Sequence, residues 1–119
     1  MKSLHGLIDD FCNAAIAKEA PSIPTKEDHR LHKVMSVSYA AIMRFGDEGR
    51  EAFISLLRHE SDSVKSWVAA QLLTEKNKEA QNVLRALSKK SGSIGFNATM
   101  TLQEFANGRL GSPFGKHGK

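Results

Sequence analysis

Apolar residues recur at helical spacing along almost the whole chain. Near the N-terminus they follow the steps i, i+3, i+4, i+7 and i+8, in Leu4, Leu7, Ile8, Phe11, Cys12, Ala15 and Ile16. This spacing places them on one face of a helix and is incompatible with the alternation of a strand. The pattern predicts a helix over residues 3–19.

Capping residues and helix breakers divide the rest of the chain into five further predicted helices. Pro21 and Pro24 interrupt the backbone, and Thr25 with Asp28 forms an acidic capping box that opens a helix continuing to Phe45. The remaining helices are expected from Asp47 to the polar turn at 60–63, over 64–74, after the cap Asn77 with Gly92 beyond the helix end, and after Ser93 to about Asn107-Gly108. Asp47, Asp62 and Asn77 are the expected caps. The predicted fold is all-α, with about six helices in three pairs.

The hydrophobic pattern superposes on itself when the chain is shifted by thirty residues. The matching columns in the second helix of each pair are Val34/Val64/Ile94, Ser38/Val68/Ala98 and Ile42/Leu72/Leu102, and in the first helices Leu57 matches Leu87. A fixed period of this length is typical of a helical solenoid, in which each helix pair buries its apolar face against the next. The alternative is chance alignment of amphipathic helices, which would allow several equally good shifts.

The most informative stretch is Asp62-Ser63-Val64-Lys65-Ser66-Trp67-Val68-Ala69-Ala70, followed by Leu72-Leu73. It resembles the second helix of HEAT-like repeats, which has an Asp in the turn, then Val, a basic residue and a paired Ala-Ala before Leu. The third copy departs from this pattern at Gly92, Gly95 and Asn97, where the motif has better helix formers. The first copy has Tyr39-Ala40-Ala41 one residue out of phase.

Residues 30–110 therefore resemble a small bacterial family of HEAT-like proteins of unknown function. The closing segment Ala98-Thr99-Met100-Thr101-Leu102-Gln103-Glu104-Phe105-Ala106-Asn107-Gly108 adds to the likeness. The resemblance implies a short α-α solenoid without catalytic residues, and some such proteins are similar to immunity proteins of contact-dependent growth inhibition systems. We expect one HEAT-like domain over residues 1–110 and a flexible basic tail over 111–119.

Charge is unevenly distributed along the chain of 119 residues, which has a formal net charge of +4. Residues 1–60 carry 8 Lys and Arg against 9 Asp and Glu, whereas residues 61–119 carry 9 against 4. The densest basic pieces are Lys76/Lys78, Lys89/Lys90 and the tail with Lys116 and Lys119. This excess either forms a solvated surface or attracts an anionic partner.

The sequence contains no motif that predicts catalysis or a cofactor. Phosphate-binding loops, a dinucleotide fingerprint and zinc knuckles are all missing, so we expect a protein that is not an enzyme. His29 and His32 could supply two ligands to a metal, but no spacing selects a third ligand, and an exposed polar face near a helix start is the preferred interpretation. Cys12, the single cysteine, lies among apolar residues and is expected to fill the core, the alternative being a reactive thiol.

We expect the protein to bind another protein. The interface candidates lie on the second helices of the pairs, which line the concave side in HEAT-like proteins: Met35, Tyr39, Met43, Lys65, Leu73 and Phe96. The alternative is that these side chains pack between neighbouring helices, and this is what we expect for Trp67. The leading hypothesis is an immunity protein that neutralises a cognate toxin by direct binding in the cytoplasm, with no membrane segment. The alternative is nucleic-acid binding through the basic second half.

Overall fold

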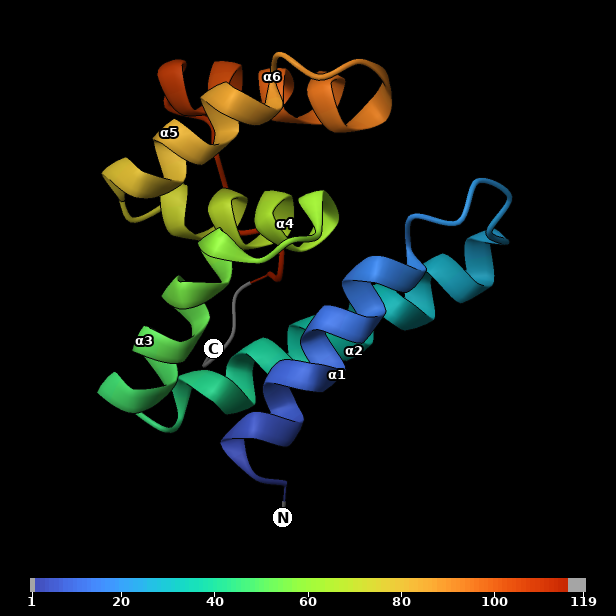
Figure 1. Ribbon diagram of the computed structural model, residues 1–119, viewed down its shortest axis with the longest axis vertical. Coiled ribbons are helices and arrows are strands. Elements are labelled where there is room, and N and C mark those ends of the chain that lie inside the picture. Colours follow the sequence, from blue (N-terminus) through green and yellow to red (C-terminus); the bar gives the residue numbers. More distant parts are fainter. Residues whose placement is uncertain (1, 116–119) are drawn as a thin grey trace. The chain divides into compact units, whose positions relative to one another are not determined.

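The computed structural model describes residues 2–115, and every regular element in that range is a helix (Figure 1). The six α-helices are α1 (Leu4–Ala17), α2 (Thr25–Met43), α3 (Asp47–Ser55), α4 (Asp62–Leu73), α5 (Lys78–Leu87) and α6 (Gly92–Ala106). A short 3₁₀ helix, η1 (Leu56–Arg58), follows α3 directly. The prediction of an all-α fold with six helices is confirmed, and residues 2–115 contain no strand.

The chain divides into two compact units. Unit 1 contains the residues up to Ser55 together with the segment that begins at Phe114, and unit 2 is Leu56–Pro113. In unit 1, α1 packs along α2, and α3 contacts both. In unit 2, α4 contacts η1, α5 and α6, and α5 contacts η1 and α6. The prediction of a single repeat domain over residues 1–110 stays a prediction.

Each unit has an apolar interior. In unit 1 the largest fully buried side chains are Phe11, Met35, Ile42 and Phe53. In unit 2 they are Leu57, Val64, Val68, Leu72, Leu73, Leu84 and Leu87. The column Ser38/Val68/Ala98 is buried in all three copies, whereas the other two columns include half-buried residues, namely Val34, Ile94 and Leu102.

The helix caps match the sequence prediction only in part. Asn77 caps α5 as expected, because its side-chain oxygen accepts a hydrogen bond of 2.9 Å from the Ala80 N–H. Asp62 is not the cap of α4: the Ser61 hydroxyl accepts from the Val64 N–H, and Asp62 is the first residue of the helix. Thr25 likewise lies inside α2, which Pro24 precedes without a side-chain cap.

Phe114 lies in the segment that the sequence predicts to be a flexible tail, yet only 2% of its surface is exposed. Its ring contacts Phe11 edge-on, with centroids 5.4 Å apart, and lies 5.2 Å from the ring of Tyr39. Burial of this large aromatic ring stabilises the packed position of the segment in unit 1. The neighbouring Gly and Pro residues, in contrast, are typical of a flexible tail. The predicted tail also includes 116–119, which lie outside the described residues.

Candidate protein-binding surfaces

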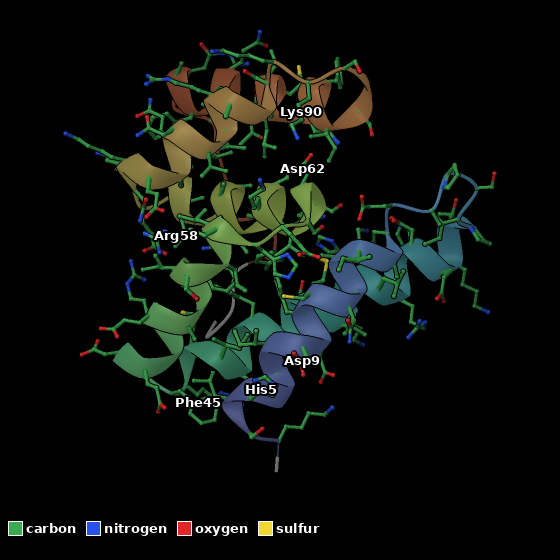
Figure 2. All side chains as sticks on the ribbon, viewed as in Figure 1. His5, Asp9, Phe45, Arg58, Asp62 and Lys90 are labelled. Carbon is green, nitrogen blue, oxygen red and sulfur yellow. The ribbon has the colours of Figure 1, made fainter. Side chains whose placement is uncertain are left out.

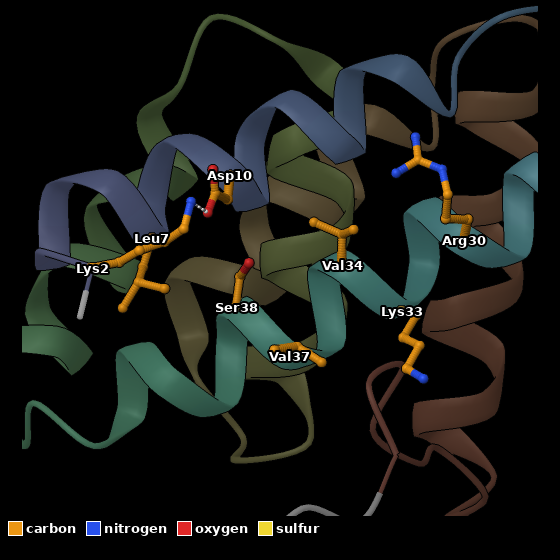
Figure 3. Close-up of a pocket in the computed structure, with 8 residues that line it drawn as sticks. All are labelled: Lys2, Leu7, Asp10, Arg30, Lys33, Val34, Val37 and Ser38. Carbon is orange, nitrogen blue, oxygen red and sulfur yellow. Dashed lines mark ion pairs between the residues drawn. The ribbon is translucent and has the colours of Figure 1, made fainter.

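An open groove of about 370 Å³ runs between α1 and α2 in unit 1 (Figure 3). Its floor is apolar and consists of Leu7 from α1 with Val34 and Val37 from α2. The side chains of Lys2, Arg30 and Lys33 lie around it, together with Asp10 and Ser38. The groove therefore combines an apolar floor with a mainly cationic rim.

Helical spacing places the groove residues of each helix on one face of that helix. Val34, Val37 and Ser38 are related by i, i+3 and i+4 on α2, and Leu7 and Asp10 by i, i+3 on α1. Leu7 and Ser38 are buried, whereas 58% of the Val37 surface is exposed. The groove is thus a shallow surface feature with one large, uncovered apolar side chain.

Two of the three cations at the groove already have an anionic partner. The Lys2 ammonium lies 2.7 Å from the carboxylate of Asp10, and Arg30 donates two hydrogen bonds of 2.7 Å to Glu27. The hydrogen bond from Arg30 holds the pKa of Glu27 below its ordinary value. Within residues 2–115, Lys33 forms no ion pair, so it is the cation most available to an anionic ligand.

The predicted interface residues differ widely in their exposure. Met35 and Leu73 are fully buried, because their positions on α2 and α4 turn toward the cores of the two units. Phe96 is 66% exposed. The others are half-buried: Met43; Tyr39, whose ring packs 5.0 Å from that of Phe53; and Lys65, which pairs with Asp62 at 3.3 Å.

Two of the six candidates, Met35 and Leu73, are therefore core residues of their units, and the six are divided between the two units. Met35, Tyr39 and Met43 belong to unit 1, and the other three belong to unit 2. The candidates also omit Val37, Lys33 and Met100. Val37 carries a signal that could have been used, since it is apolar and lies off the buried face of α2 that contains Met35, Ser38 and Ile42.

Basic side chains line the outer side of α5 in unit 2. Lys78, Asn82 and Arg85 are exposed and follow the steps i, i+4 and i+7, so they share one face of α5, and the exposed Lys89 lies in the turn that follows the helix. No acidic residue pairs with these three cations among the described residues, whereas Arg58 pairs with Glu79 at 3.0 Å. This basic stripe concentrates the positive charge of the second half of the chain.

The Asp62 carboxylate connects the start of α4 to the turn before α6 by an ion pair with Lys90 (Figure 2). It accepts a hydrogen bond of 2.6 Å from Lys90, which lies just before α6, and it lies 3.3 Å from Lys65 within α4. The hydrogen bond from Lys90, followed by that from Lys65, holds the pKa of Asp62 below its ordinary value. Asp62 thus has a structural role in unit 2.

The described residues include no group of three or more His, Cys, Asp and Glu that could hold a metal ion. His29 is exposed, and His32 lies 6.1 Å from the ring of Phe114. Burial, with a smaller contribution from Asp9, raises the pKa of the Cys12 thiol to about 11. Because the thiolate is the nucleophilic form, this shift favours the interpretation of Cys12 as a core residue.

Comparison of the chain with protein families, curated proteins and solved structures finds no match. Within residues 2–115, no helix combines the length and apolarity needed to cross a membrane.

Proposed function

We propose that this protein is a noncatalytic protein-binding module that holds a segment of its partner in the α1–α2 groove. The observation that carries this proposal is the exposed Val37 on an apolar floor beside the unpaired Lys33. Such a surface complements a segment that has apolar side chains on one face and carboxylates next to them.

The shape of the groove favours a protein segment over a small molecule. Small-molecule sites typically cover about 70–90% of the ligand, which requires an enclosed cavity. Here more than half of Val37 faces solvent, so a small ligand would remain largely uncovered. An amphipathic helix, in contrast, contacts a shallow groove along its length through residues at i, i+3, i+4 and i+7.

We further propose that the helices stack as a short HEAT-like solenoid and that the partner is a bacterial toxin, which the protein neutralises in the cytoplasm as an immunity protein. Contacts within unit 2 support the stacking: η1 contacts α5 and α4 contacts α6, so each helix contacts its counterpart thirty residues later. The Asp62–Lys90 ion pair also links positions on successive hairpins. The resemblance of residues 62–70 to HEAT-like repeats supports the choice of partner.

The test uses the product of the reading frame adjacent to the gene. We expect this protein to bind that product and to relieve the growth arrest that it causes. Val37→Asp and Lys33→Glu should each weaken binding about tenfold, the effect of removing one interface anchor. Lys26→Glu is the matched control, because Lys26 is an exposed cation of α2 that does not line the groove, and it should bind as the wild type does. No retention of the neighbouring product at low salt would contradict the proposal.

Nucleic-acid binding is the second candidate function, and the basic stripe on α5 favours it. Each phosphate that a Lys or Arg contacts on duplex DNA contributes about −0.9 to the slope of log affinity against log salt. Three contacts, from Lys78, Arg85 and Lys89, predict a slope of about −2.7. The measurement is duplex binding at several salt concentrations, with Arg85→Glu as the variant. An affinity that does not change with salt, or no binding at low salt, would exclude this function.

A further inference from the structure

The last helix of unit 2, α6, exposes only uncharged residues. They include Phe96 at 66% and Met100 at 42% exposure, and the full set is Gly92, Ser93, Phe96, Asn97, Thr99, Met100, Gln103 and Ala106. Its one charged residue, Glu104, is half-buried. Since Phe96, Met100 and Gln103 are related by i, i+4 and i+7, they form a single outer face, which we call the α6 face.

No other helix of the described chain has such a face. Helices α1, α2, α3 and α5 each expose at least one charged side chain, and α4 has no exposed residue. One quarter of the residues in the sequence are charged, so a charge-free face along a helix of 15 residues is unusual for a surface that stays in water. An exposed apolar patch bordered by polar, uncharged residues marks an interaction surface.

The packing of α6 explains why its large side chains remain outside. Its only buried residues are Gly95 and Ala98, which are small and let the helix lie close to its neighbours. Phe96 and Met100 lie away from the core of unit 2 and leave 66% and 42% of their surface exposed. Covering this remaining apolar surface with another apolar surface lowers the free energy further.

We propose that the α6 face binds the α6 face of a second copy of this chain and forms a two-fold symmetric dimer. In such an interface the same patch meets itself, so any charge near its centre faces a like charge. The α6 face avoids this repulsion, whereas the basic stripe on α5 and the cations around the groove would not. With a formal net charge of +4, two copies repel each other in every orientation that brings their basic faces together.

The size of the face sets the strength of the dimer. A helix of 15 residues is about 22 Å long, at about 1.5 Å per residue. One helix face of that length gives an interface at or below the lower limit of about 1,200 Å² for stable complexes. We therefore expect a reversible dimer with a dissociation constant in the micromolar range.

Sedimentation equilibrium of the full chain, from about 1 µM to about 1 mM, measures this association in the range where such interfaces dissociate. The expected result is a monomer–dimer equilibrium whose dissociation constant stays constant or decreases as salt increases, because salt screens the net repulsion and no ion pair is lost. Phe96→Asp should raise the dissociation constant at least tenfold, since the substitution acts on both sides of a symmetric interface. Far-UV circular dichroism should show an unchanged fold, because Phe96 is mostly exposed.

Val37→Asp is the matched control: it replaces an exposed apolar residue of unit 1 with the same charge and should leave the dimer intact. If Val37→Asp weakens association as much as Phe96→Asp does, the association is nonspecific and the proposal is wrong. A chain that stays monomeric over the whole range, or one that forms open-ended assemblies, would also overturn it. The outcome does not depend on the proposed function, which uses the groove of unit 1.

Discussion

Replacing Gly95 by alanine tests the close approach between α6 and the turn that precedes it. Gly95 is buried in α6, and a Cβ atom added there would lie 1.7 Å from the carbonyl oxygen of Lys90 and 2.8 Å from its carbon. Both are backbone atoms, so no side-chain rotation relieves the overlap. Either the start of α6 or the turn before it must move.

Two effects of opposite sign decide the magnitude. Alanine is a better helix former than glycine by about 1 kcal/mol, so in an open helix the substitution would stabilise the protein. Here the Lys90 oxygen and the new Cβ must separate by at least 1.3 Å, the difference between 1.7 Å and the 3.0 Å below which such contacts essentially never occur. Overpacking with backbone shifts costs about 1–3 kcal/mol and sometimes more, and this shift lies at the upper end. We expect a net loss of about 2 kcal/mol in the free energy of unfolding of unit 2.

Tryptophan fluorescence during urea unfolding measures this loss, because Trp67 is the only tryptophan of the chain and lies in unit 2. The matched control in the same unit is Gly111→Ala. Gly111 has an ordinary backbone conformation with nothing within 4 Å of the added Cβ, so this variant should be as stable as the wild type or slightly more stable. If Gly95→Ala proves as stable as the wild type, then the helix propensity dominates and the close approach described above is wrong.

Two further substitutions test unit 1 and the pH dependence of unit 2. Phe114→Ala should destabilise unit 1 by about 3 kcal/mol, as for other buried Phe side chains; thermal unfolding measures it, with the more exposed Phe45→Ala as a nearly neutral control. Asp62→Asn should cost about 1 kcal/mol at neutral pH, the sum of two partly exposed ion pairs. Because the folded-state pKa of Asp62 is lowered, its contribution is complete above about pH 4 and is lost as the pH falls through the folded value. The gap between wild type and variant in urea unfolding should therefore narrow as the pH falls below about 4, whereas Glu60→Gln should be as stable as the wild type at neutral pH; an unchanged gap in acid would contradict the role given to Asp62.

Helix positions and some of the inward-facing residues could be predicted from the sequence because both depend on local periodicity, although Met35 and Leu73, predicted as interface residues, are fully buried. Each α-helix lies within about two residues of its expected start, and the buried column Ser38/Val68/Ala98 follows from the thirty-residue shift alone. The capping residue of α4 was harder to predict, because Ser61 and Asp62 are both good capping residues and are adjacent in sequence. The choice between them depends on tertiary contacts: Asp62 is held by Lys90, 28 residues later.

Phe114 and the α1–α2 groove could not be predicted in this way. The segment around Phe114 has the Gly and Pro content of a tail, and only the long-range contact with Phe11 and Tyr39 shows that it is packed. The groove depends on how far apart two helices lie, which residue spacing along one helix does not determine. Val37 could have been identified as a groove residue, because it is apolar and lies off the buried face of α2. Leu7, which lines the groove from α1, has the spacing of an ordinary core residue.

Gly95 shows most clearly how one feature supports opposite interpretations in sequence and in structure. In the sequence, Gly95 is a departure from the HEAT-like repeat pattern, because glycine weakens a helix. In the structure the missing Cβ is what allows the turn before α6 to approach the helix, and Gly49 makes the same kind of contact in unit 1, where an added Cβ would lie 1.9 Å from the Ile42 oxygen. Because the buried residues of α6 are only Gly95 and Ala98, Phe96 and Met100 remain exposed, and Phe96 is the most exposed large apolar side chain described. The same small residues thus determine both the close packing of α6 and the apolar face that we propose binds a second copy.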